Sequence, residues 1–293
     1  MINNLFTVIV NWNLKEDTIH CVDSLFKAGI KNGHVIVVDN GSNDGSVTEL
    51  QEKYGSSIII IQNKENLGYT IGVNIGIQYA LNNNAKWILL LNNDAYVEEK
   101  FIVEMENAIK QDDRISIIGP VILYHENPNR IWFLGSKLIP KTLITYSLYK
   151  NHIYDLSLPS LFFVDFISGC GMLIKSDVFN TIGYFDTSYI MYGEEVDWCW
   201  RAINAGYKIA VATKAKMWHK ISTSSNRVKP ITHYLKIRNQ IRFYRTYSYG
   251  LKLILMFVFS VAHTAIILIN DIFHKQYKLI SPLCRGFLDG WKD

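Results

Sequence analysis

Apolar and polar positions follow two different periods in the first hundred residues of the chain. Runs of consecutive apolar residues occupy 6–10, 35–38, 58–61 and 87–91. Segments with helical spacing of apolar residues lie between them, at about 15–27, from 46 onward and at about 70–81. Strands that are apolar throughout and alternate with helices predict an α/β fold, with a mostly parallel sheet and helices on both faces. Ligands of such sheets bind beyond the carboxyl ends of the strands, so polar residues there are the first candidates for function.

The remainder of the chain is less regular. Its expected elements, in chain order, are short strands and loops at 120–159, a strand region at 162–174, a helix from 194 to about 204, a helix at 230–249 and an apolar run at 251–269. We therefore divide the chain into an α/β domain over 1–229 and a basic, hydrophobic helical region over 230–293.

Charge is distributed unevenly. The whole sequence carries 30 Lys and Arg against 26 Asp and Glu, but residues 213–293 hold 14 basic residues against 3 acidic ones. Such a basic region predicts a polyanionic partner: a membrane surface, a lipid-linked phosphate or nucleic acid. The four cysteines are scattered and form no CxxC pair, which indicates neither a zinc site nor a disulfide framework.

The segment 39–46, directly after the second strand, is the first polar cluster at a strand end. The Asp39 carboxylate can accept hydrogen bonds from a pyrimidine N–H or from ribose hydroxyls, and Ser42 lies beside it. The alternative is a plain turn that leads into a helix, with Ser46 and Glu49 as a capping box.

Asn92, Asn93 and Asp94 follow the most hydrophobic strand. A carboxylate at that position can hold Mg²⁺ or Mn²⁺ against a diphosphate, because hard divalent ions take oxygen ligands and keep only one or two protein carboxylates in such sites. The alternative is that Asp94 caps a helix before Glu98. The position at a strand end favours the metal.

Glu194, Glu195 and Asp197 lie in the first turn of a predicted helix. Acids there complement the helix dipole, and Asp197 can pair with Arg201. Crowded carboxylates also raise one another's pKa, which suits a general base near neutral pH, so we favour a catalytic role. Trp198 beside them is a candidate wall for a sugar.

Taken in order, these segments resemble family 2 glycosyltransferases, in particular the bacterial rhamnosyltransferase-like branch with a GT-A fold. The matching segments are 8–13, 37–42, 66–69, 74–76, 90–94, 168–173, 183–186, 192–197, 218–219 and 238–239. Their order and spacing, over roughly residues 5–245, make the resemblance specific. It implies an inverting transfer of a sugar from a dTDP- or UDP-sugar to an acceptor hydroxyl.

The resemblance also assigns roles. The donor nucleotide would contact Val10, Asn11, Trp12, Asp39, Ser42, Asn66, Gly68, Asn74, Asn92 and Asn93. Asp94 and His219 would bind a divalent metal, Mn²⁺ or Mg²⁺, although a lone histidine is more often structural. Glu195 would be the general base, with Glu194 as the other candidate. The acceptor would contact Gly169, Trp198 and Arg238.

Two positions depart from the family pattern. Asn92 stands where the metal motif has its first Asp, which leaves Asp94 as the main carboxylate. Glu195 stands where the base is Asp, and the added methylene changes its reach. These departures keep a non-catalytic nucleotide-sugar or glycan-binding protein open as an alternative. A sugar nucleotidyltransferase is a second alternative, although that class usually carries a Gly-rich stretch after the first strand, where this chain has Asn11, Trp12 and Asn13.

The C-terminal region combines Arg238, Arg242 and Arg245 on one helix face with the apolar run at 251–269. An amphipathic helix in the membrane interface accounts for both features. A membrane span, or helices packed on the body or on another subunit of a homo-oligomer, are the alternatives. We expect a cytoplasmic enzyme at the inner face of the membrane, acting on a glycan or lipid-linked acceptor, and no nucleic-acid partner.

Overall fold

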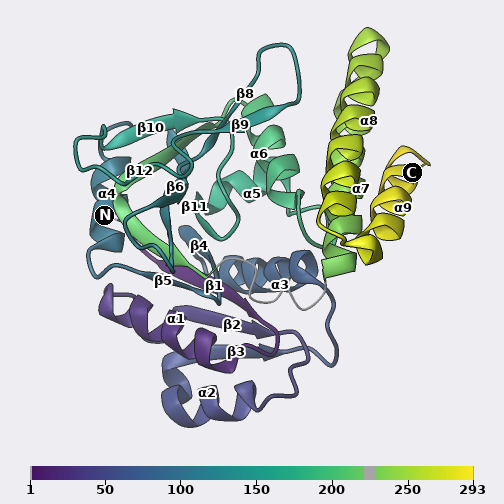
Figure 1. Ribbon diagram of the computed structural model, residues 1–293. Helices are drawn as coiled ribbons and strands as arrows, with labels where there is room; N and C mark the ends of the chain where they lie inside the picture. The colour runs from purple at the N-terminus through teal and green to yellow at the C-terminus, as the bar shows by residue number, and fades with distance from the viewer. Residues whose placement is uncertain (1, 221–228, 293) are drawn as a thin grey trace.

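The computed structural model describes residues 2–220 and 229–292 (Figure 1). The strands are β1 (Leu5–Asn11), β2 (Val35–Asp39), β3 (Ile58–Gln62), β4 (Trp87–Asn92), β5 (Ala95–Val97), β6 (Ile115–Tyr124), β7 (Ile131–Phe133), β8 (Ser136–Leu138), β9 (Thr145–Ser147), β10 (Leu161–Val164), β11 (Gly171–Lys175) and β12 (Lys208–His219). The helices are α1 (Lys15–Lys27), α2 (Ser46–Tyr54), α3 (Tyr69–Asn82), α4 (Phe101–Ile109), α5 (Ser176–Ile182), α6 (Glu194–Asn204), α7 (Lys229–Tyr247), α8 (Gly250–Phe273) and α9 (Ile280–Lys292), with 3₁₀ turns η1 (Gly55–Ser57), η2 (Thr187–Tyr189) and η4 (Tyr277–Leu279).

The main sheet has the strand order β10-β12-β6-β11-β4-β1-β2-β3, with β5 paired to β12 and β7 to β6. The first four strands of the chain pair in parallel, as the apolar runs predict. The sheet becomes mixed beyond β4, because β11 is antiparallel to both β4 and β6. The α/β fold is therefore confirmed, with a parallel sheet formed by the first four strands and a mixed part beyond β4, in which β6 and β12 pair in parallel.

Helices cover both faces of this sheet. Along β2 the side chains of Val35 and Val37 belong to the hydrophobic cluster on the face covered by α1, α2 and α4, whereas Ile36 and Val38 belong to the cluster on the face covered by α3, α5 and α6. All four are fully buried, which is why the run is apolar throughout instead of alternating. The polar ends of β1, β2 and β4 are left at one edge, where the loops that follow them lie together.

The start of α2 differs from the predicted capping box. Gly45 is the N-cap residue, with a positive φ of 83°, and Ser46 is the first helical residue. The Asp44 carboxylate accepts hydrogen bonds from the Ser46 N–H, at 3.0 Å, and from its hydroxyl. Asp44 thus accepts from the Ser46 N–H, the donor that the capping box assigned to the Glu49 side chain, and the Glu49 N–H donates to the Gly45 carbonyl instead of the Ser46 hydroxyl.

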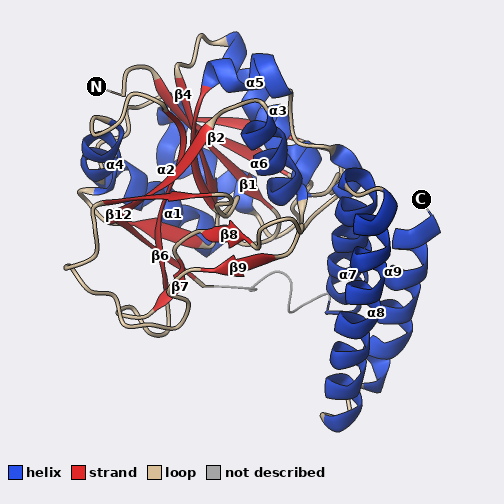
Figure 2. Ribbon diagram, turned by 90° about the horizontal axis from the view of Figure 1, so that it is seen from above, coloured by secondary structure: helices blue, strands red, loops and turns tan. Residues whose placement is uncertain are grey.

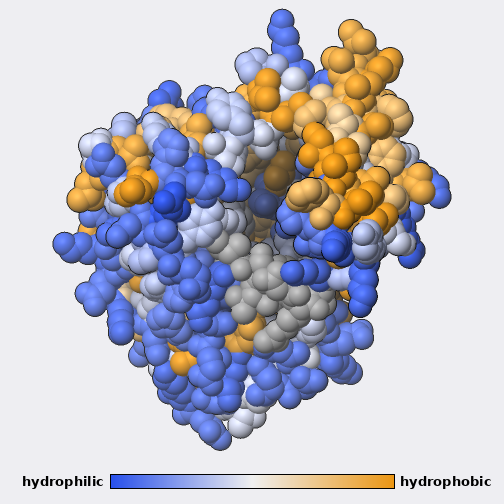
Figure 3. Space-filling view, viewed as in Figure 1, coloured by the Kyte–Doolittle hydropathy of each residue, from blue (hydrophilic) through white to orange (hydrophobic). Residues whose placement is uncertain are grey.

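Helices α7, α8 and α9 lie side by side and stand apart from the sheet in both ribbon views (Figures 1 and 2). Polar pairs hold α8 to α7, with His263 Nδ1 2.9 Å from Gln240 Oε1 and His233 Nε2 3.3 Å from Asp271 Oδ2. Of the described helices, α8 alone is long and apolar enough to cross a membrane. Much of its surface is exposed, and apolar residues gather over these helices in the space-filling view (Figure 3).

Candidate active site

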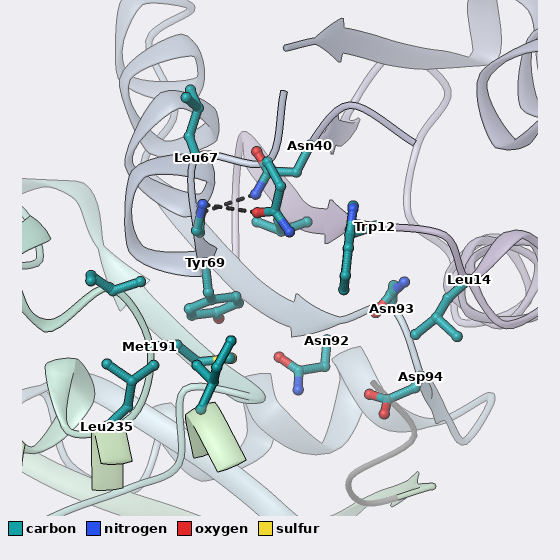
Figure 4. Close-up of a pocket in the computed structure, with 15 residues that line it drawn as sticks. Trp12, Leu14, Asn40, Leu67, Tyr69, Asn92, Asn93, Asp94, Met191 and Leu235 are labelled. Atoms are coloured by element: carbon teal, nitrogen blue, oxygen red, sulfur yellow. Dashed lines mark hydrogen bonds between the residues drawn. The ribbon is translucent and has the colours of Figure 1, made fainter. Parts of the chain in front are cut away.

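Two adjoining cavities lie at the carboxyl ends of β1, β2 and β4. The first has a volume of about 440 Å³. Its wall is mostly apolar and comes from Val10, Trp12, Leu14, Asn40, Asn66, Leu67, Gly68, Tyr69, Asn92, Asn93, Asp94, Ile190, Met191, Ile231 and Leu235. In Figure 4, Trp12 and Asp94 project from one side of this cavity, and Met191 and Leu235 from the other. A flat, half-buried Trp beside polar amides suits a nucleobase and ribose.

Six of the ten predicted nucleotide contacts line this cavity, and four lie behind it. The six are Val10, Trp12, Asn66, Gly68, Asn92 and Asn93. Asn11 and Asp39 are fully buried, with Asn11 Nδ2 donating to Asp39 Oδ1 at 2.8 Å and to Ser42 Oγ at 3.1 Å. The other Asp39 oxygen accepts from the Ser42 N–H at 2.9 Å. In this structure the Asp39 carboxylate thus fixes the loop after β2.

Asn74 and Asn40 differ from the roles that the sequence predicts. Asn74 exchanges two hydrogen bonds with the backbone of Phe185, so it ties α3 to the segment before α6. Asn40, which was not predicted, lines the cavity and donates to the Gly68 carbonyl at 2.9 Å. Its place one residue beyond Asp39 was the available signal, because successive side chains of an extended segment point to opposite sides.

Asp94 and His219 come together from the end of β4 and the end of β12. The imidazole Nε2 lies 3.0 Å from Asp94 Oδ1, and both side chains are buried. Burial opposes the charged carboxylate, but the hydrogen bond and charge of His219 outweigh it and hold the pKa of Asp94 below its ordinary value. Asn92 lies next to the pair, with Nδ2 3.4 Å from the same imidazole nitrogen.

This pair fits a divalent metal that relies on its substrate for further ligands. An ionised carboxylate oxygen and an imidazole nitrogen are both suitable donors for Mn²⁺. Within residues 2–220 and 229–292, no group of three or more His, Cys, Asp or Glu side chains is placed to hold an ion. Phosphate and water would therefore complete the shell, which is common where Mg²⁺ or Mn²⁺ acts with nucleotides.

The second cavity, of about 420 Å³, shares Tyr69, Asn92, Asp94 and Met191 with the first. Its remaining lining comes from Trp132, Lys150, Ser168, Gly169, Cys170, Tyr192, Glu194, Glu195, His219 and Lys236. The predicted metal residues and the predicted acidic pair thus face one continuous space. Gly169 belongs to this wall, and a Cβ at that position would lie 3.5 Å from Glu195 Cβ.

Glu194 and Glu195 are the acidic groups of this second cavity. Burial, and then the charge of Glu195, raises the pKa of Glu194 well above its ordinary value. Burial also raises the pKa of Glu195, although Oε2 accepts a hydrogen bond from the Gly193 N–H at 3.1 Å. Glu194 Oε2 is buried without a hydrogen-bond partner among the described residues. Both carboxylates therefore hold a proton more strongly than an ordinary glutamate, which suits a general base.

Two predicted site residues of α6 have structural surroundings instead. Asp197 is buried between the Arg201 guanidinium, at 2.9 Å, and the Tyr247 hydroxyl, at 2.7 Å, so its carboxylate is already occupied. Trp198 is fully buried, and its indole donates to the Gly183 carbonyl. The expectation that Trp198 offers a face to a sugar is wrong, because the helix turns that face into the core.

Arg238 also lies outside both cavity walls. Its guanidinium donates to the Ser188 carbonyl at 2.5 Å and to Asn239 Oδ1 at 3.0 Å. The arginine therefore braces the segment around η2 in this structure. A contact between Arg238 and an acceptor stays a prediction.

Comparison with known proteins places the chain among sugar transferases. The family model described as glycosyl transferase family 2 matches residues 7–183. A hexosyltransferase of low-salt glycan biosynthesis, Agl10 of Haloferax volcanii, is 28% identical over 302 residues, which cover 99% of this chain and 92% of that protein. The dTDP-rhamnosyl transferase RfbF of Shigella flexneri is 24% identical, with 99% and 98% covered.

Solved structures agree on the fold. A mannosyltransferase of Pyrobaculum calidifontis, in complex with GDP-Man and Mn²⁺, superposes with a TM-score of 0.57 at 11% identity and covers 99% of this chain and 87% of that one. GalNAc-T7, with UDP, GalNAc and Mn²⁺, superposes with a TM-score of 0.60 at 15% identity over 82% of this chain. The chain spans about half the length of GalNAc-T7, since 47% of it is covered.

Proposed function

The chain belongs to glycosyl transferase family 2, and we propose that it transfers a sugar, with rhamnose as the candidate, from a dTDP- or UDP-sugar to an acceptor hydroxyl with inversion. The observation that carries the proposal is the shared wall of the two cavities. Asn92 and Asp94 belong to both, so a group bound in the first cavity ends next to the acidic pair of the second. Rhamnose is suggested by the relative named as a dTDP-rhamnosyl transferase.

In this proposal the first cavity binds the nucleotide. Trp12 supplies a flat surface for the base, and the Asn66 amide supplies a donor for the base or ribose, while Asn40, which donates to the Gly68 carbonyl, holds the loop that lines the cavity. The diphosphate then lies toward Asp94 and His219, and the sugar extends into the second cavity. A bound Mn²⁺ or Mg²⁺ would stabilise the negative charge that develops on the departing nucleoside diphosphate.

Glu195 takes the proton in the chemical step. Its carboxylate accepts the proton of the acceptor hydroxyl while that oxygen forms a bond to the anomeric carbon. The bond between that carbon and the diphosphate oxygen breaks, and the electron pair leaves with the nucleoside diphosphate. Attack from the side opposite the leaving group inverts the anomeric configuration. The raised pKa of Glu195 suits a base that must hold this proton after the transfer.

We further propose that α8 seats the enzyme on the inner face of a membrane, where a glycan or lipid-linked acceptor is presented for surface polysaccharide synthesis. The helix exposes a stripe of apolar residues at helical spacing, and residues 213–293 carry 14 basic residues against 3 acidic ones. Apolar insertion combined with attraction to anionic headgroups is the usual basis of interfacial binding.

The test measures nucleoside diphosphate release from UDP-, dTDP- and GDP-sugars, with Mn²⁺ or Mg²⁺ and then with EDTA. Membrane lipid extract serves as the acceptor source. We expect release from one donor, lost with EDTA and in Glu195→Gln, and retained in Glu52→Gln, whose side chain is exposed on α2. Titration calorimetry with UDP and dTDP gives an independent measure of the nucleotide site. Absence of both binding and release would refute the proposal.

A further inference from the structure

The backbone that leads into the acidic pair has an unusual conformation. Ile190, Tyr192 and Gly193 have φ values of 64°, 69° and 92°, in the left-handed region. Residues with a side chain rarely adopt such values, and β-branched Ile is among the least suited. A segment of this kind persists only where its surroundings hold it. The 190–193 segment is therefore a place where a few contacts decide the position of the next two residues, Glu194 and Glu195.

Asn239 of α7 makes those contacts. Its amide nitrogen lies 2.8 Å from the Tyr189 carbonyl, 2.9 Å from that of Met191 and 2.6 Å from that of Tyr192. The side chain is almost completely buried, and its amide oxygen accepts from Arg238 at 3.0 Å. This one side chain, with two N–H groups, thus faces three carbonyls, of which that of Tyr189 also accepts from the Met191 N–H at 2.6 Å. Buried carbonyls without a donor are costly, so the segment depends on this amide.

The two halves of the segment are anchored differently. At the side of the first cavity, the Ile190 carbonyl accepts from the Thr70 N–H at 3.1 Å and from the Thr70 hydroxyl at 2.9 Å, so α3 holds this half of the segment. At the side of the acidic pair, Tyr192 meets α7: its carbonyl accepts from Asn239, and its ring lies under the Lys236 ammonium at 4.9 Å. Loss of the amide would release the second half while Thr70 still holds the first.

We infer that Asn239 is a positioning residue for the acidic pair, and that α7 is thereby part of the catalytic apparatus. The inference rests on the proposed function, since it concerns the base of that reaction. The Asn239 amide fixes the left-handed turn at Tyr192 and Gly193, and this turn sets where Glu195 begins. The Gly193 N–H that meets Glu195 Oε2 belongs to the same turn. The helical region that begins at residue 229 thus determines the geometry of a site formed mainly by the residues before it.

Asn239→Asp is the sharpest variant, because it keeps the size of the side chain and replaces an N–H donor with an acceptor that faces three carbonyls. Gln240→Ala is the matched control: it removes the neighbouring side chain of α7, whose oxygen contacts His263 of α8. Hydrogen exchange of full-length protein, read on peptides covering 189–195, should accelerate at least about tenfold in Asn239→Asp and Asn239→Ala. It should stay at the wild-type rate in Gln240→Ala.

Kinetics supply the second readout. In Asn239→Asp we expect kcat to fall at least about tenfold, while the Kd of UDP or dTDP changes less than about threefold, because Trp12 in the wall of the first cavity is untouched and Thr70 still holds Ile190. A merely structural role would lower the melting temperature without this split. Gly193→Ala tests the same turn from the other side, since its φ of 92° strains any residue with a side chain. Gly193→Ala should likewise lower kcat while leaving the Kd of UDP or dTDP nearly unchanged.

The outcomes separate the two proposals. Wild-type protein that neither binds nor consumes a nucleotide sugar would refute the proposed function, and the exchange data would still report on the segment. Active wild-type protein with normal exchange and normal kcat in Asn239→Asp would overturn the role of Asn239 alone. If Asn239→Asp does not fold, Gly193→Ala with unchanged kcat overturns it.

Discussion

His219 Nε2 lies 3.0 Å from Asp94 Oδ1, although 125 residues separate the two along the chain. The pairing of β12 with β5 produces this contact, because His219 is in register with Ala95, the residue after Asp94. The contact also places a neutralising partner beside a buried carboxylate, whose pKa it lowers. Asp94 is therefore ionised at neutral pH and available to a cation.

The first prediction concerns this pair. Asp94→Asn and His219→Ala should each weaken Mn²⁺ binding in the presence of UDP or dTDP by at least about 10- to 100-fold, the range seen when only a group hydrogen-bonded to a metal ligand is lost. Asp94→Asn should have the larger effect, because it removes the charge. Titration calorimetry gives the affinities. Asp112→Asn, which disrupts an exposed pair with Arg114, is the control. Equal Mn²⁺ affinity in wild type and both variants would contradict a metal site here.

The second prediction concerns the buried Glu194. Its pKa is raised on folding, so its protonated form stabilises the protein below the ordinary glutamate value, and this contribution is lost as pH rises through the raised value. Glu194→Gln stays neutral throughout. The difference in free energy of unfolding between variant and wild type should therefore shift in favour of the variant as pH rises from about 4.5.

Chemical denaturation at a series of pH values measures that difference. In Glu194→Gln the free energy of unfolding should depend less steeply on pH than in wild type. Some dependence should remain, since Glu195 also has a raised pKa and is present in the variant. Glu52→Gln, exposed on α2, should leave the pH dependence as it is in wild type. A constant difference between Glu194→Gln and wild type across this range would show that the carboxyl group is not destabilised by burial.

Much of the fold can be predicted from the sequence because its cause is local. Consecutive apolar residues such as Val35–Val38 are typical of strands buried on both faces, and the chain shows four such runs, although the run at 58–61 forms the edge strand β3 and is mostly half-buried. The same reasoning places Asp94 at a strand end without any knowledge of β12. The mixed part of the sheet beyond β4 was not predictable in this way, because β6 and β12 pair in parallel across more than ninety residues and their register depends on tertiary packing.

The candidate site was predictable by residue type more than by side-chain direction. Glu195 and Trp198 lie three residues apart on α6, and both were assigned to the site. The two side chains lie on one face of the helix, but Glu195 in the first turn reaches the cavity and Trp198, one turn later, lies in the core, which a cluster of acids and aromatics does not reveal. Asn239 matches the family pattern at 238–239 but gave no chemical signal of its role, because a buried amide that holds carbonyls looks like any polar residue on a helix.

The third prediction explains the glycine of the 74–76 segment. A Cβ on Gly76 would lie 2.2 Å from Val8 Cγ1 and 3.2 Å from Val38 Cγ2. The close packing of α3 on β1 and β2 therefore requires a residue without a side chain at this position. Gly76→Ala should lower the free energy of unfolding by about 1–3 kcal/mol despite the better helix propensity of Ala. Urea denaturation measures the change, with the exposed Gln78→Ala as the control.

A double variant tests the cause of that loss. Val8→Ala removes the methyl groups that the new Cβ of Gly76→Ala would strike. The loss of stability in the double variant should therefore be smaller than the sum of the two single losses. Strict additivity would indicate that the strain has another source than contact between α3 and β1.

The last prediction concerns the exposed face of α8. Val258 and Ile266 lie on its apolar stripe, with 59% and 65% of their surface exposed, and no described residue covers them. Replacing both by Glu should reduce binding to phosphatidylcholine–phosphatidylglycerol vesicles at least about tenfold, because each loses an apolar insertion worth roughly 1.5–3 kcal/mol and adds a charge that the headgroups repel. Flotation on a density gradient separates bound from free protein.

Val103→Glu is the matched control for this experiment, since Val103 is also an exposed apolar residue but lies on α4 of the body. It should leave vesicle binding unchanged. Sedimentation velocity on the same samples tests the alternative that the apolar stripe of α8 binds a second copy of the chain. The stripe would instead be a subunit interface if wild-type protein does not bind vesicles and sediments as a dimer. In that case the Glu substitutions at 258 and 266 should convert the dimer to a monomer. Vesicle binding that survives both substitutions would show that the stripe does not insert, and that the basic residues of the C-terminal region act by charge alone.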